Sequence, residues 1–175
     1  AVADGVVFVF ALNNISRPDL AVENSARVTK KEGTVLVADP GPTRWVTSIL
    51  LESLGGKDGR KILGDRKYWE ISDFFNKSPY SMDEYTDFFI NNRMGTTREE
   101  MLQEVTTLLR DTGQSYKERQ KARFSFHELI TKKYYRYLQS LFESQGFTLV
   151  KSGIMAAAQN SAVKEWTVSN PIEGN

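Results

Sequence analysis

The segment from about Ser81 to Gly146 carries repeated helix start signals on an apolar stripe, and this feature constrains the fold more than any other. Ser81 with Glu84, and Thr97 with Glu100, fit the capping box, in which a hydroxyl accepts an orphan N–H and the glutamate reaches back to the cap. Apolar residues at helical spacing follow each start, and each run ends at a glycine. The middle of the chain is therefore predicted to be a packed helical layer.

The rest of the chain divides into strands, further helices and loops. Strand composition predicts strands at 5–12, 33–38, 147–151 and 163–168, with the first of them buried and a polar connection between the first two. Helical spacing predicts helices at 43–54, 66–76 and 115–145, in addition to those opened by Ser81 and Thr97. The glycine-rich stretch 55–64 is expected to be an exposed loop.

Strands at both ends with helices between them predict an α+β fold. The expected architecture is a small mixed or antiparallel sheet from the N- and C-terminal segments, packed against a central layer of about four to five helices. At 175 residues the chain has the length of one ordinary domain, which we place at 1–169, followed by a flexible tail at 170–175.

Composition narrows the range of functions. An apolar share of 40% and a charged share of 26% are typical of a soluble globular chain. No apolar run is long enough to form a transmembrane segment, and the absence of cysteine excludes disulfides and thiolate metal sites. The first residue is Ala1 and not methionine, which fits a processed mature chain or an excised domain and leaves the compartment open. We expect no cofactor and no metal.

An aromatic-rich stretch is the main functional candidate. Eight rings fall within residues 68–89, more than one short helical hairpin can easily bury. Tyrosine and tryptophan are enriched at protein interfaces, so some of these rings are expected to meet a protein partner or a second copy of the chain. The alternative is that they cover the sheet. The predicted partner-binding residues are Tyr68, Trp69, Phe74, Phe75, Tyr80 and Tyr85.

A basic stretch offers a second hypothesis, the binding of nucleic acid or another polyanion. Residues 116–137 hold seven basic side chains against two acidic ones, although the whole chain carries a net charge of only +1. Helical geometry places most aromatic residues of this stretch on the side opposite several of the cations, so a solvated surface is the competing interpretation. The candidate anion-binding residues are Lys117, Arg119, Lys121, Arg123, Lys132, Lys133 and Arg136.

The third hypothesis is an enzyme that uses His127, the only histidine, or distant carboxylates. His127 and Glu128 begin a zinc-protease pattern, but Thr131 occupies the place of the second histidine. The sequence thus predicts no catalytic residue. We expect a non-catalytic structural, assembly or adaptor subunit that acts through protein–protein contacts of its aromatic-rich helical surface.

Overall fold

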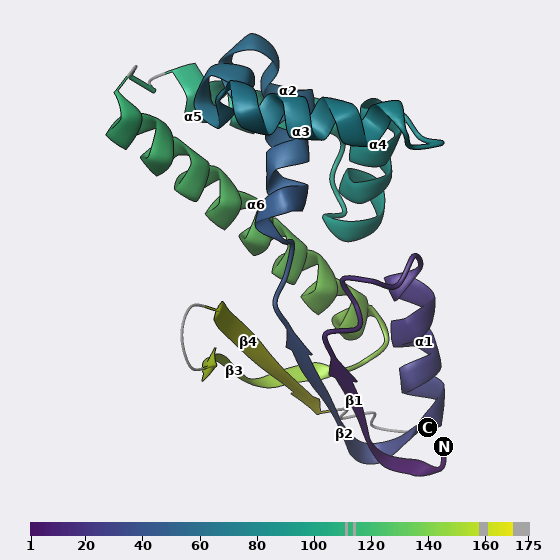
Figure 1. Cartoon of the computed structure of the whole chain (residues 1–175). Helices are drawn as coiled ribbons and strands as arrows, with labels where there is room; N and C mark the ends of the chain where they lie inside the picture. Colours follow the sequence, from purple (N-terminus) through teal and green to yellow (C-terminus); the bar gives the residue numbers. More distant parts are fainter. Residues whose placement is uncertain (111, 114, 158–160, 170–175) are drawn as a thin grey trace. The chain divides into compact units, whose positions relative to one another are not determined.

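A computed structural model describes residues 1–110, 112–113, 115–157 and 161–169, with the backbone alone from Lys151 onward (Figure 1). The chain forms two compact units. The sheet unit comprises Ala1–Gly41 and Tyr135–Asn175, and the helical unit comprises Pro42–Tyr134. A single domain over 1–169 stays a prediction, and the predicted tail at 170–175 lies outside the described residues.

The sheet unit contains β1 (Ala3–Val9), β2 (Thr29–Asp39), β3 (Thr148–Ala157) and β4 (Ser161–Ser169). These four strands lie in the order β1-β2-β4-β3 (Figure 1). β1 and β2 are parallel, whereas β4 runs antiparallel to both of its neighbours. The sheet is therefore mixed and comes from the two ends of the sequence, which confirms the predicted α+β fold class.

One face of the parallel pair is buried. Phe8 lies beside Val37 in the register of β1 and β2, and Val35 and Val37 are 0% and 1% exposed. Phe8 also meets Phe142 edge-on, with ring centroids 6.3 Å apart. Phe142 lies near the end of α6 (Tyr116–Ser144), so the last turns of this helix cover the buried face of the sheet.

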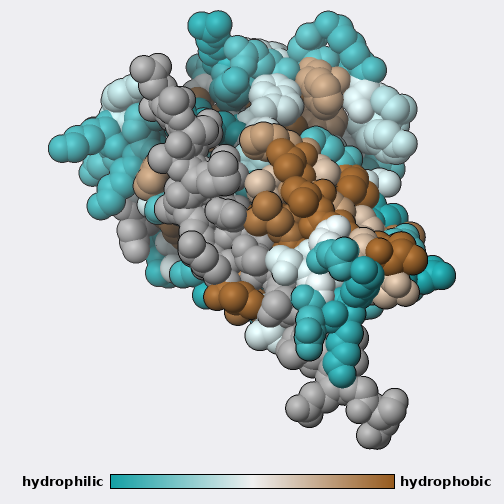
Figure 2. All heavy atoms as spheres, turned by 90° about the horizontal axis from the view of Figure 1, so that it is seen from below, coloured by the Kyte–Doolittle hydropathy of each residue, from teal (hydrophilic) through white to brown (hydrophobic). Residues whose placement is uncertain are grey.

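The other face of β1 is exposed, which corrects the prediction of a buried first strand. Val7 and Val9 are 60% and 55% exposed, and β1 is an edge strand with a described neighbour on one side only. Figure 2 shows hydrophobic side chains gathered at the surface in the view that it gives. Parallel strands are usually covered on both faces, so an apolar run alone suggested burial that this strand does not have.

The predicted polar connection between the first two strands is largely a helix, α1 (Pro18–Val28). Pro18 stands in the first turn, where its missing N–H costs nothing. The buried side of the helix is partly polar, because Ser25 Oγ donates to the Val22 carbonyl at 2.7 Å and Thr29 Oγ1 donates to the Ser25 carbonyl at 2.7 Å. These local hydrogen bonds let hydroxyls occupy positions where the sequence pattern required apolar residues.

The helical unit contains α2 (Arg44–Leu63), α3 (Asp65–Asn76), α4 (Met82–Arg93), α5 (Arg98–Arg110) and α6 up to Tyr134. Both predicted capping boxes are present. Ser81 Oγ accepts from the Glu84 N–H at 3.2 Å while the glutamate accepts from the Ser81 N–H, and Thr97 and Glu100 exchange the same two bonds. The caps satisfy N–H groups that the first helical turn leaves unpaired.

The predicted loop at 55–64 is wrong for most of its length. The helix breaks at Gly56, whose φ of 51° and ψ of −130° are not helical, and resumes through Leu63. The second segment packs closely on the first, because a Cβ built on the buried Gly59 would lie 2.1 Å from the Leu51 carbonyl oxygen. The glycines therefore serve a kink and a close helix–helix contact instead of an open loop.

Apolar side chains from α2 to α6 form the core of the helical unit. The most deeply buried include Ile49, Leu50, Ile71, Ile90, Met101, Val105, Phe126 and Ile130. They stand at the helical spacing read from the sequence. Within the described part of the chain, no helix combines the length and apolar character that crossing a bilayer requires.

Candidate functional site

The carboxyl ends of the two parallel strands meet at a buried carboxylate. Asp39, the last residue of β2, is 1% exposed. Its Oδ2 accepts the main-chain N–H of Asn13 at 3.0 Å, and its Oδ1 accepts that of Gly41 at 2.9 Å. This carboxylate joins the loop after β1 to the turn after β2. We call residues 10–14 and 39–41 the strand-end site.

The backbone reverses sharply at this site. Phe10 has a φ of 49°, in the left-handed region that costs a non-glycine residue about 1–2 kcal/mol. Its N–H still donates to the Ala38 carbonyl at 2.8 Å, and its own carbonyl accepts from Asn14 Nδ2 at 3.0 Å. Backbone strain of this kind concentrates where a fold positions groups for a ligand.

One acceptor at the strand-end site has no hydrogen-bond partner among the described residues. Asn13 Oδ1 is buried and accepts no hydrogen bond from them, although the Asn13 N–H is bonded to Asp39. Burying such an oxygen without a donor costs about 1–3 kcal/mol. The side-chain carbonyl of Asn13 is thus a buried acceptor without a described donor.

The charge of the strand-end site limits its ligands. Asp39 is the one charged residue within 10–14 and 39–41. Arg17, a few residues further along, is bonded to Asp19, with Nη2 and Oδ2 2.6 Å apart. The loop after β1 also lacks the glycine pattern that cradles phosphates in dinucleotide-binding folds. The loop after β1 is therefore not a phosphate-binding loop of that type.

The six aromatic residues predicted to bind a partner belong to α3, to α4 and to the turn between them. Trp69, Phe74 and Tyr80 are 61%, 47% and 64% exposed, whereas the other three, Tyr68, Phe75 and Tyr85, are half-buried. Of the two further rings in this stretch, Phe88 is 43% exposed and Phe89 is 7% exposed. The stretch therefore divides between core and surface.

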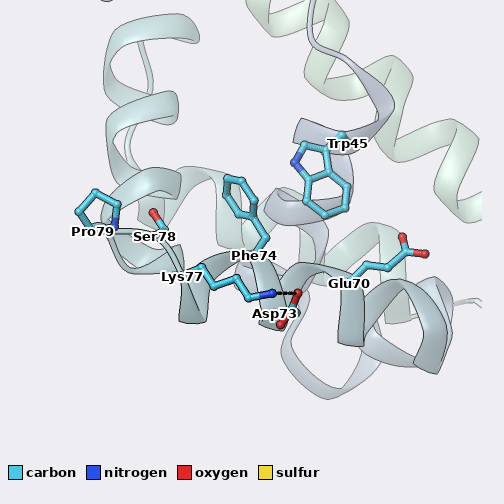
Figure 3. Close-up of a pocket in the computed structure, with 7 residues that line it drawn as sticks. All are labelled: Trp45, Glu70, Asp73, Phe74, Lys77, Ser78 and Pro79. Atoms are coloured by element: carbon cyan, nitrogen blue, oxygen red, sulfur yellow. Dashed lines mark hydrogen bonds and ion pairs between the residues drawn. The ribbon is translucent and has the colours of Figure 1, made fainter.

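Several of these rings form a continuous series of contacts. Phe74 meets Trp45 at 5.8 Å and Phe75 at 5.0 Å between ring centroids, and Phe75 meets Tyr85 at 5.9 Å. Trp45 and Phe74 line an open groove of about 650 Å³, whose rim carries an ion pair between Lys77 and Asp73 (Figure 3). We call this groove, which is lined by Trp45, Glu70, Asp73, Phe74, Lys77, Ser78 and Pro79, the aromatic groove.

The seven candidate anion-binding cations lie along α6 in different surroundings. Lys117, Lys121, Lys132 and Arg136 are exposed, whereas Arg119, Arg123 and Lys133 are half-buried. Lys133 Nζ lies 2.6 Å from Glu104 Oε1 of α5, which neutralises it. The polyanion hypothesis stays a prediction.

His127 is half-buried on α6. Burial and the nearby Arg44 guanidinium hold the pKa of His127 below its usual value, so the imidazole is neutral at pH 7. Its Nδ1 is buried and bonded to no described group. Among the described residues, no cluster of three or more histidine, aspartate or glutamate side chains could hold a metal ion.

Sequence reasoning missed the strand-end site. Asn13-Asn14 and Asp39-Pro40-Gly41-Pro42 were visible as turn signals after apolar runs, but their significance depends on β1 and β2 being parallel neighbours. In an open sheet with parallel strands, ligands bind outside the carboxyl ends of those strands. No protein-family model, curated protein or solved structure matches the chain. The functional conclusion therefore rests on the geometry.

Proposed function

We propose that this chain binds a small organic molecule at the strand-end site. The observation that carries the proposal is the buried, unpartnered Oδ1 of Asn13 beside the buried Asp39 carboxylate, at the carboxyl ends of two parallel strands. Ligands of open sheets with parallel strands occupy this position. The left-handed Phe10 holds the loop in the conformation that presents Asn13.

The ligand should carry an N–H or O–H donor, because Asn13 supplies an acceptor. The Asn13 and Gly41 N–H groups are already bonded to Asp39, so they are not available to bind a phosphate. Nucleosides, amino acids and amines fit this description, whereas nucleotides do not.

Thermal-shift screening of the whole chain against nucleosides, amino acids, amines and their phosphorylated counterparts tests the proposal. We expect the stabilising compounds to be unphosphorylated. A ligand that binds the native state raises the melting temperature, and the rise grows with the logarithm of the ligand concentration over its Kd. Asn13→Ala should weaken their binding about tenfold, a change of ~1.4 kcal/mol. Asn24→Ala, at an exposed position on α1, is the matched control and should bind as the parent chain does. Stabilisation by phosphates alone would reject this ligand chemistry.

A second candidate function, docking of a protein partner on the exposed rings of α3 and of the turn after it, is supported by the exposure of Trp69, Phe74 and Tyr80. Large rings at an interface contribute disproportionately to affinity when a partner excludes water from them. Trp69→Ala should lower the affinity of a captured partner by tenfold or more while changing the free energy of unfolding by less than about 1 kcal/mol. A large loss of stability with unchanged binding would contradict this function.

A further inference from the structure

A small pocket lies inside the helical unit, away from the aromatic groove. It has a volume of about 150 Å³ and opens between α2, α3 and α4. Glu52 lines it from α2, Met82 lines it from α4, and the residues that line it from α3 are Tyr68, Ile71, Ser72, Phe75 and Asn76. The volume equals that of about five liquid water molecules, enough for a short organic group. Tyr68 and Phe75 also belong to the predicted partner-binding set, whereas Glu52 belongs to none of the three functions read from the sequence.

Glu52 is the unusual member of this lining. The residue is 9% exposed, and its Oε2 is buried with no hydrogen-bond partner among the described groups. A carboxylate taken out of water without a counter-ion or a donor is unfavourable, and proteins seldom retain one unless something pairs with it. Burial accordingly raises the pKa of Glu52 above its ordinary value, and the Arg60 guanidinium offsets part of this rise.

Arg60 does not serve as the partner of Glu52. Its guanidinium carbon lies 3.6 Å from the centroid of the Tyr68 ring, and its Nε lies 3.9 Å from an Asp65 carboxylate oxygen. The Arg60 side chain is 41% exposed, so it stands at the surface. No ion pair or hydrogen bond joins it to Glu52 among those the structure describes. The buried carboxylate oxygen thus remains for a ligand.

The rest of the lining suits an organic cation. Phe75 supplies an aromatic ring, and rings of this kind attract positive charge, whereas one face of the Tyr68 ring already holds the Arg60 guanidinium. Ile71 and Met82 supply apolar walls for a short alkyl chain, and the Ser72 hydroxyl can accept a hydrogen bond from an ammonium group. The combination of one carboxylate, aromatic rings and an apolar wall differs from a metal site, which would need several oxygen ligands.

We propose that this pocket binds a small alkylammonium group, with Glu52 as its counter-ion and the Phe75 ring against its alkyl part. The site belongs to the helical unit and is independent of the strand-end site. Its ligand is a primary amine of a few carbon atoms, or the aminoalkyl end of a larger molecule whose remainder projects out of the pocket.

Titration of the whole chain with n-propylammonium chloride, followed by amide chemical shifts, tests the proposal. We expect saturable shifts at residues of α2 and α3 around the pocket, and none with n-propanol, propionate or sodium chloride at the same concentrations. The comparison separates the ammonium charge from the alkyl chain and from ionic strength.

Glu52→Gln keeps the shape of the side chain and removes its charge, so it should weaken propylammonium binding at least tenfold. Glu70→Gln, on the exposed side of α3, is the matched control and should leave binding unchanged. Phe75→Leu is a second test of the site that does not alter Glu52, and it should weaken propylammonium binding several-fold. Equal affinity in Glu52→Gln and the parent chain, or no saturable shift in the folded parent chain, would overturn the proposal.

Discussion

The phenol of Tyr135 donates a hydrogen bond of 2.6 Å to the main-chain carbonyl of Asp39, 96 residues earlier in the chain. Both groups are buried. This bond fixes the end of β2 to α6, at the residue whose carboxylate also joins the two segments of the strand-end site. The geometry of that site therefore depends on a side chain that does not line it.

Tyr135→Phe tests this dependence. Removal of the hydroxyl leaves the Asp39 carbonyl without that donor, so the free energy of unfolding should fall by about 1–3 kcal/mol. Urea denaturation followed by circular dichroism measures the change. Tyr116→Phe, at a residue that is 71% exposed, should leave the midpoint where it is. Equal midpoints for the two variants would show that the Tyr135 bond contributes nothing.

Gly59→Ala tests the contact between the two segments of α2. Alanine normally stabilises a helix by up to about 1 kcal/mol relative to glycine. Here the new methyl group would lie 2.1 Å from the Leu51 carbonyl oxygen, so we expect a net loss of about 1–3 kcal/mol in thermal or urea unfolding. Lys57→Ala, at an exposed position of the same segment, is the control. A stabilised Gly59→Ala variant would mean that the two segments do not touch there.

Arg98→Ala removes the residue that joins the starts of α4 and α5. The Arg98 guanidinium lies 2.6 Å from an Asp83 oxygen and 2.8 Å from an Asp87 oxygen, and it also donates to Ser53 of α2 at 3.0 Å. The Arg98 side chain is 27% exposed, so solvent screens part of this energy and a loss of about 1–2 kcal/mol is expected.

The control for Arg98 is Arg66→Ala, since the Arg66 side chain is 95% exposed and pairs with one glutamate of its own helix. Its effect should stay below about 0.5 kcal/mol.

Hydrogen bonds from Arg98 and Ser53 also lower the pKa of Asp83. The stabilisation from the ion pair between Arg98 and Asp83 should therefore be complete at pH values above 3.8, the ordinary pKa of aspartate. It should fade as the pH falls through the lowered pKa of Asp83.

Glu52→Gln should stabilise the chain near neutral pH in the absence of ligand. Because burial raises the pKa of Glu52, the folded state binds the proton more tightly than the unfolded state does. The stability of the parent chain should fall as the pH rises from the ordinary pKa of 4.5 through the raised pKa, and the variant should not show this fall. Urea midpoints at pH 4, 6 and 8 check the difference, which should grow with pH. Arg60, the charged group that acts on Glu52, is unchanged in both proteins.

The sequence was sufficient to predict secondary structure where the stabilising interactions join residues close together in the chain. The capping boxes at Ser81 and Thr97 form as predicted because their partners stand three residues apart. Local reasoning failed at α1. The buried positions Ser25 and Thr29 look solvent-facing in the sequence because they are polar, but their hydroxyls donate to main-chain carbonyls of α1. It failed again after Gly56, because glycines that permit a close helix contact resemble glycines of a loop.

The candidate sites depend on pairings that the sequence does not reveal. Asp39 becomes significant only because the parallel register of β1 and β2 brings the Asn13 N–H to it. In the sequence, Glu52 resembles an ordinary surface glutamate of a helix. Its position in a pocket becomes visible only when residues of α3 and α4 are seen to line the same cavity. The exposed rings Trp69 and Tyr80 were found from composition, because an excess of aromatic residues is visible without any pairing.

The outer edge of β1 has a practical consequence for anyone handling the isolated chain. Val7 and Val9 stand beside main-chain amides and carbonyls that no described strand pairs. Such an edge accepts strands from neighbouring copies. Concentrated samples should consequently aggregate on storage, and Val7→Lys should prevent this aggregation.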